Sequence, residues 1–149
     1  MKKKIAFLVL LCMIVMSFGA FAQSSVILIN GEQAVIGEGM GSVVEKNDRT
    51  FVPVRFVLEY FGYEVFWDAD KETVLGRNNQ GRVFVMQIGS PLLIFVNDDG
   101  TNQKSYMMDV EPFLNYEEGR TYVPLRFLAE GLGYKVGYDE ETRTVTLNK

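Results

Sequence analysis

The chain carries two matched pairs of carboxylates, the residue type with which glycoside hydrolases cleave sugars. Glu59 matches Glu130, and Asp68 matches Asp139. Each pair also has a structural explanation, because the glutamates fall on solvated helix faces and the aspartates begin turns. Nucleophiles activated by histidine are excluded, since the chain has no His and its one Cys, Cys12, lies in a predicted leader. We therefore expect no enzymatic activity and no cofactor, with a carboxylate-based glycoside hydrolase as the third-ranked alternative.

The segment Asp68-x-Asp70-x-Glu72 has the spacing of the first three ligands of a calcium loop. Thr73 stands where that loop needs Gly, and Asn79 stands where it needs a bidentate Glu. A solvated turn is the favoured interpretation, and a weak calcium site at Asp68–Glu72 stays open.

Arg55 and Arg126 lie in the first turn of two expected helices, four residues before Glu59 and Glu130. They are candidates for binding an anion. The alternative is a contact with a carboxylate or carbonyl that ties helix to sheet. Because cations are disfavoured at a helix N-terminus, each Arg needs a specific partner, and the structural role is favoured.

The aromatic residues Tyr63, Phe66, Trp67 and Tyr138 could stack on sugar rings. Strand alternation places Tyr63 and Trp67 on one face and Phe66 on the other. Core packing is favoured for Tyr63 and Trp67, whereas Phe66, whose counterpart is Gly137, is the better candidate for an exposed aromatic. The candidate binding surface is therefore Phe66, Trp67 and Tyr63.

A repeat positions all of these residues. Residues 49–74 return 71 residues later as 120–145, with 13 of 26 positions identical, so the fold is built from two copies of one unit. The matched positions to which we assign structural roles are Pro53, Arg55, Glu59, Gly62, Asp68, Pro124, Arg126, Glu130, Gly133 and Asp139.

Each copy predicts a β-prone Thr-aromatic-Val-Pro segment, a short helix and a strand hairpin. The helix begins near Pro53 or Pro124 and ends at a left-handed Gly62 or Gly133. An Asn30-Gly31 turn adds a hairpin before the first copy. We expect an α+β fold of two repeated strand–helix–strand–strand units, with a mainly antiparallel sheet and two short helices packed on it. The repeats span about residues 26–79 and 80–149.

Residues 1–22 have the pattern of a signal peptide, with a Lys-rich start, an apolar stretch and Ala20-Phe21-Ala22 before the cleavage site. Removing Lys2, Lys3 and Lys4 leaves 12 of the 15 basic residues against 19 acidic ones in residues 23–149, a net charge of −7. This charge disfavours nucleic acid and anionic membranes as partners. We expect a secreted or cell-surface protein, with no membrane association after cleavage.

The doubled Arg-Thr-aromatic-Val-Pro-x-Arg-Phe motif, followed by Gly-Tyr-x-Val and Asp68 or Asp139, resembles the copper amine oxidase N-terminal-like (stalk-type) domain family. The resemblance covers about residues 26–147. It implies an α+β module that is appended to oxidases and is itself non-catalytic. Asn115-Tyr116-Glu117 superficially resembles the site of the oxidases' quinone, but that chemistry needs copper held by imidazoles, which this chain lacks.

We therefore expect a secreted, non-catalytic binding module for a cell-envelope component, either wall glycan or a surface protein. The alternative is a structural domain that forms oligomers by pairing its edge strands. The sequence leaves the ligand, the binding face and the oligomeric state open.

Overall fold

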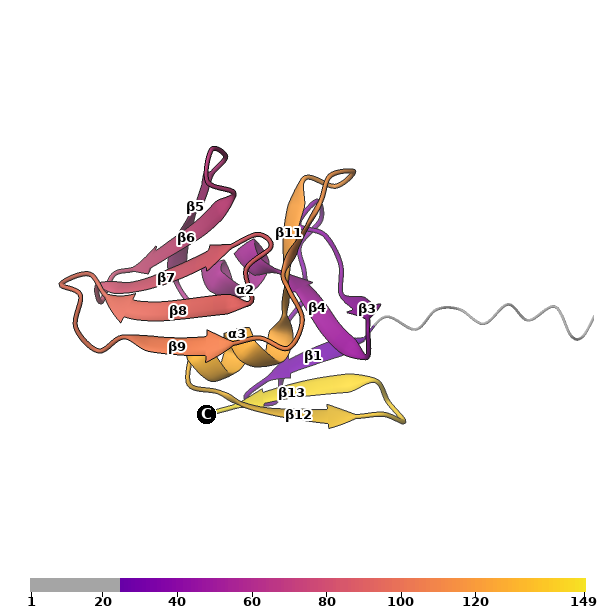
Figure 1. The fold of residues 1–149 in the computed structure, drawn as a ribbon. Coiled ribbons are helices and arrows are strands. Elements are labelled where there is room, and N and C mark those ends of the chain that lie inside the picture. The colour runs from indigo at the N-terminus through magenta and orange to yellow at the C-terminus, as the bar shows by residue number, and fades with distance from the viewer. Residues whose placement is uncertain (1–24) are drawn as a thin grey trace, which may run out of the picture.

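The structure, a computed structural model, describes residues 25–149 (Figure 1). The predicted signal peptide at residues 1–22 lies outside this range. The described chain has thirteen strands and two helices. Up to residue 78 they are β1 (Val26–Ile29), β2 (Glu32–Gln33), β3 (Val44–Lys46), β4 (Arg49–Pro53), α2 (Val54–Tyr60), β5 (Tyr63–Asp68) and β6 (Thr73–Asn78). The later elements are β7 (Arg82–Gln87), β8 (Leu92–Asn97), β9 (Lys104–Met107), β10 (Phe113–Asn115), β11 (Arg120–Pro124), α3 (Leu125–Gly131), β12 (Lys135–Asp139) and β13 (Thr144–Asn148). Neither helix in this range is long and apolar enough to span a bilayer.

Both helices begin and end as the sequence predicts. Pro53 and Pro124 are the N-cap residues, with φ of −60° and −61°. A proline fits there because the missing N–H would have had no partner within the helix. Gly62 and Gly133 follow the helices with φ of +79° and +87°. Their N–H groups donate to the carbonyls three residues back, which closes the last turn.

A central four-stranded sheet, sheet B, joins the two repeats in the order β10-β11-β4-β3. Strands β4 and β11 pair antiparallel with Val52 opposite Val123. These two valines occupy the same position of the repeat, 71 residues apart. The two copies are therefore related by a local two-fold axis through this pair.

The two outer sheets exchange strands between the repeats. Sheet A has the order β12-β13-β1-β2, and its β1–β13 pair is the parallel one. Sheet C has the order β5-β6-β7-β8-β9 and is antiparallel throughout. The α+β class, the mainly antiparallel pairing and the two short helices are confirmed. The strands form three sheets, because each helix redirects the chain so that the following hairpin leaves sheet B.

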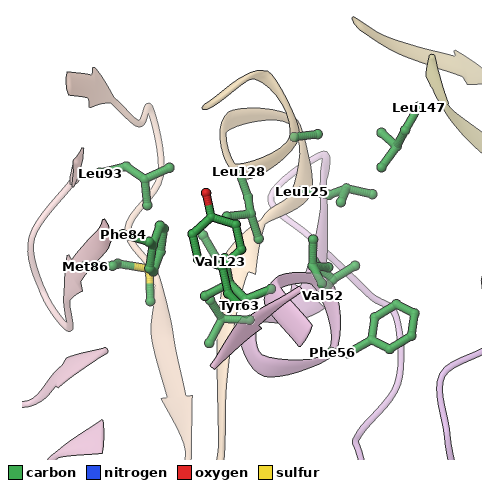
Figure 2. Close-up of a cluster of buried hydrophobic side chains, with 14 of the residues drawn as sticks. Val52, Phe56, Tyr63, Phe84, Met86, Leu93, Val123, Leu125, Leu128 and Leu147 are labelled. Carbon is green, nitrogen blue, oxygen red and sulfur yellow. The ribbon is translucent and has the colours of Figure 1, made fainter. Parts of the chain in front are cut away.

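The core lies where the three sheets meet the helices (Figure 2). Phe84 and Leu93 of sheet C point toward Leu128 of α3, while Val52 and Val123 fill the centre from sheet B. Tyr63 lies within the same cluster. Helices of seven residues do not persist alone, so this shared core is what holds them.

Candidate functional site

The paired carboxylates lie on the surface and do not line a common cavity. Glu59 and Glu130 are exposed on α2 and α3, and neither lines a groove described below. Asp68 and Asp139 form the expected turns. The Asp139 carboxylate accepts the Thr142 N–H at 3.0 Å, and this backbone hydrogen bond lowers the pKa of Asp139. All four carboxylates therefore lie where their structural roles place them, the glutamates on exposed helix faces and the aspartates in turns.

The Asp68–Glu72 segment is a turn held by its own backbone. Asp68 Oδ1 accepts the N–H groups of Asp70 and Lys71, both at 3.1 Å. Lys71 Nζ lies 3.5 Å from Asp68 Oδ2, which places a cation where a metal would sit. Within residues 25–149, no cluster of three or more His, Cys, Asp or Glu has the geometry to hold a metal ion.

The arginines in the first turns of the two helices, Arg55 and Arg126, differ in their contacts. Arg55 Nη1 lies 3.5 Å from Glu59 Oε1, an exposed pair within α2. The expected carboxylate partner is present, but the contact stays within the helix and does not tie it to a sheet. Arg126 makes no hydrogen bond or ion pair with any residue in the described range.

Tyr63 and Phe66 separate as the strand alternation predicts, whereas Trp67 does not share the burial of Tyr63. Tyr63 is only 7% exposed, and its burial raises its pKa. Tyr63 belongs to the core, so we remove it from the candidate binding surface. Phe66, on the opposite face of β5, is 50% exposed. Trp67 is 38% exposed, because β5 extends beyond the core at its end, so its expected core packing is incomplete.

Two grooves lie at opposite ends of the β4–β11 ladder, and the repeat relates them. The Trp67 groove lies between the β5–β6 hairpin and the β10–β11 hairpin. These two hairpins project in the same direction in Figure 1. The Tyr138 groove lies between the β12–β13 hairpin and strands β3 and β4. Nine of the 11 residues that line the Trp67 groove have their repeat counterpart in the Tyr138 groove. The matched pairs are Pro53 and Pro124, Val54 and Leu125, Arg55 and Arg126, Val65 and Val136, Trp67 and Tyr138, Val74 and Val145, Gly119 and Asp48, Arg120 and Arg49, and Thr121 and Thr50.

The plan common to both grooves is an apolar floor, one matched aromatic position (Trp67 or Tyr138) and two arginines. Each groove also has a second, unmatched ring, Phe66 in the Trp67 groove and Phe127 in the Tyr138 groove. The floor comes from the helix start, the aromatic from the following hairpin, and the second Arg from the other repeat's strand. The plan depends on the pairing of β4 with β11, because this pairing brings residues of both copies into each groove.

The Trp67 groove is the smaller, with a volume of about 190 Å³, and its arginines already have partners. Arg55 faces Glu59. Arg120 Nε donates to the Gly39 carbonyl at 3.1 Å, and its Nη1 donates to the Gly119 carbonyl. Ligand pockets usually measure roughly 300–1,000 Å³, so this groove is small for a ligand.

The Tyr138 groove has a volume of about 700 Å³, within the range of ligand pockets. Arg49 is held on one wall, where its Nε donates to Asp109 Oδ2 at 3.1 Å and its Nη1 donates to the Asp48 carbonyl at 2.9 Å. Glu45 Oε1 accepts the hydroxyls of Ser25 at 2.7 Å and Thr50 at 3.0 Å. The side chains of this wall are therefore held by hydrogen bonds within the protein.

Arg126 and Tyr138 are the available groups of this groove. Tyr138 is 45% exposed, and Arg126 has no hydrogen-bond partner in residues 25–149. The hydrogen bond from Arg49 holds the pKa of Asp109 below its ordinary value, and the charge of Arg126 adds to this effect. Four carboxylates line the groove against two guanidinium groups, so its field opposes anionic ligands.

Sequence reasoning missed Arg49, Thr50 and Asp109. The first two were visible as the identical Arg-Thr that opens each repeat. Asp109 carries no repeat signal and reaches Arg49 across 60 residues of sequence. Tyr138 was considered as a sugar platform but not placed in the candidate surface.

The fold defines a class: an α+β module of duplicated strand–helix units. The chain belongs to the copper amine oxidase N-terminal domain family, which it matches over residues 28–147. It is thus a non-catalytic accessory domain. Comparisons with curated proteins and with solved structures gave no match.

Proposed function

We propose that this domain is exported and binds a glycan of the cell envelope in the Tyr138 groove. The observation that carries the proposal is the combination, in one groove of about 700 Å³, of an exposed aromatic ring and a guanidinium that has no hydrogen-bond partner among residues 25–149. The lysine-rich, apolar residues 1–22 support export.

The chemistry of the groove suits a hydroxyl-rich, uncharged ligand. The face of Tyr138 can stack on the apolar face of a pyranose, and its hydroxyl can bond water or a sugar oxygen. The Arg126 guanidinium offers donors in a fixed plane, and nearby Glu140 offers acceptors. A neutral sugar unit can bond to both the donors and the acceptors, whereas a polyanion would be repelled by the excess of carboxylates.

The test is sedimentation of the purified protein with cell wall stripped of its proteins. We expect the wild-type protein to be retained. Tyr138→Ala should weaken retention about tenfold, since removing a central aromatic anchor costs roughly 1–2 kcal/mol of binding free energy. Arg126→Ala should also weaken retention.

The matched control is Tyr116→Ala, because Tyr116 is 78% exposed and lines neither groove. It should be retained like the wild type. Wild-type protein that stays in the supernatant, or Tyr138→Ala retained in full, would contradict the glycan proposal. Retention only by the surface-protein fraction would favour the surface-protein alternative.

A further inference from the structure

The Tyr138 ring lies among aliphatic side chains on the face of the β12–β13 hairpin that lines the Tyr138 groove. Strand alternation puts Val136 on the same face as Tyr138, and register places Val145 directly across from Tyr138. All three side chains line the groove. Leu125, the first residue of α3, adds a further apolar side chain to it. A ligand stacked on the ring therefore has aliphatic surface beside it.

The spacing of these side chains decides which part of a ligand meets them. Across the strands Val145 lies about 5 Å from Tyr138, and along β12 Val136 lies about 7 Å from it. Groups attached to a sugar ring that covers Tyr138 reach these distances. A hydroxyl group placed there gives up hydrogen bonds to water and finds no partner, which costs free energy. A methyl group placed there is favoured, because apolar surface is removed from water.

Arg126 supplies hydrogen-bond donors to the same groove. It lies in the first turn of α3 and has no hydrogen-bond partner among residues 25–149. A guanidinium group only donates, so the ligand group that meets Arg126 must be an acceptor. An ionised acceptor is disfavoured, because four carboxylates line the groove against two guanidinium groups. The acceptor should therefore be neutral, such as a carbonyl oxygen.

We propose that the sugar unit stacked on Tyr138 is an acetylated amino sugar, whose acetamido group lies in this part of the groove. The methyl group packs on Val136 beside Val145, and the carbonyl oxygen accepts a hydrogen bond from Arg126. A hydroxyl group in the same place lacks the methyl group, and a free amino group lacks both the methyl group and the carbonyl. This inference rests on the proposed function and names the kind of sugar that the groove selects.

The Trp67 groove provides a comparison within the same molecule. Its aromatic ring is also flanked by valines, which stand at the same repeat positions. The guanidinium at the position of Arg126 is that of Arg55, however, and it pairs with Glu59. The groove measures about 190 Å³, below the roughly 300 Å³ at which ligand pockets begin. We therefore assign the acetamido site to the Tyr138 groove, and Arg55→Ala is the control that matches Arg126→Ala.

The test is isothermal titration calorimetry with soluble tetramers of glucose, glucosamine and N-acetylglucosamine in the same linkage, which differ only in the group at one ring carbon. We expect the N-acetylglucosamine tetramer to bind the wild-type protein about tenfold more tightly than the glucose tetramer, because it adds a buried methyl group and a hydrogen bond. The glucosamine tetramer should bind no better than the glucose tetramer at near-physiological salt, which screens its attraction to the carboxylates.

Two substitutions separate the methyl contact from the hydrogen bond. Arg126→Ala removes the donor, and Val136→Thr keeps the shape of valine but adds a hydroxyl group where the methyl group should pack. Each should lower the preference for the N-acetylglucosamine tetramer to about threefold or less. Arg55→Ala should keep the preference of the wild type. Circular dichroism should show that all three variants are folded at the titration temperature.

Equal affinity for the glucose and N-acetylglucosamine tetramers would overturn the inference, and so would tightest binding of the glucosamine tetramer. A preference that survives both Arg126→Ala and Val136→Thr would overturn it as well. If the protein binds none of the tetramers but is retained by cell wall stripped of its proteins, this inference fails and the glycan proposal stands. If both kinds of binding are absent, the glycan proposal itself is contradicted.

Discussion

At the scale of single residues, Tyr122 shows how one side chain fixes a loop. Its ring is fully buried and stacks on Phe113, with ring centroids 5.2 Å apart. Its hydroxyl donates to Glu118 Oε2 at 2.5 Å and accepts the Ser42 N–H at 3.3 Å. The first repeat has Phe51 at this position, so the site also suits a ring without a hydroxyl. The hydroxyl therefore serves the loop before β3, not the packing.

We predict that Tyr122→Phe lowers the free energy of unfolding by about 1 kcal/mol, the usual net value of a hydrogen bond. Burial and the Glu118 carboxylate raise the pKa of Tyr122 above its ordinary value of 10.0. A raised pKa means that this stabilisation is fully present below pH 10 and is lost as pH rises through the raised value. Urea unfolding across alkaline pH should show a shallower decline for Tyr122→Phe than for the wild type. An equally steep decline in both proteins would contradict the assignment.

At the scale of elements, the two helices end differently because they face different neighbours. The last residue of α2 is Tyr60, which is 46% exposed. Its counterpart in α3, Gly131, lies against the buried ring of Phe95 in β8. A Cβ on Gly131 would lie 2.0 Å from a carbon of that ring. The glycine is thus required by close packing of α3 on sheet C.

We predict that Gly131→Ala destabilises the protein by about 2 kcal/mol, because overpacking a core costs roughly 1–3 kcal/mol. The cost should exceed the gain of about 1 kcal/mol that Ala brings to a helix. Tyr60→Ala, at the equivalent exposed position, is the control and should change the unfolding free energy by less than about 0.5 kcal/mol. In a Phe95→Leu background the penalty of Gly131→Ala should shrink. Measured stabilisation by Gly131→Ala would contradict this packing argument.

At the scale of the whole molecule, every sheet draws strands from both repeats. Sheet A joins β1 and β2 to β12 and β13, and sheet C joins β5 and β6 to β7, β8 and β9. Sheet B pairs β4 with β11 across the local two-fold axis. Neither repeat contains a complete sheet, so the two should not fold separately. The repeat boundary near residues 79 and 80 remains a prediction from sequence.

We predict a single cooperative unfolding transition. Trp67, the one Trp of the chain, reports on the first repeat by fluorescence, while far-ultraviolet circular dichroism reports on strands of both. The two signals should give coincident urea midpoints. A fragment of residues 25–79 should be unfolded alone, because β1 and β6 lose their partners β13 and β7. A folded fragment, or two separate midpoints, would contradict the exchanged architecture.

The sequence by itself determined the local structure. Pro53 and Gly62, with their counterparts Pro124 and Gly133, set the helix bounds because their backbone angles are restricted or unusually free. Asn30-Gly31 gave its hairpin turn with φ of +50° and +86°. Alternation along β5 separated Tyr63 from Phe66. Each of these effects acts within a few residues of chain.

Only the tertiary structure decided the surfaces. The Tyr138 groove joins residues of both repeats, and Asp109 meets Arg49 across 60 residues, a contact that no local pattern encodes. The exposure of Trp67 depends on how far β5 extends beyond the core. The exchange of strands among three sheets depends on which hairpins bury each other's apolar faces, and that is a property of the packed molecule as a whole.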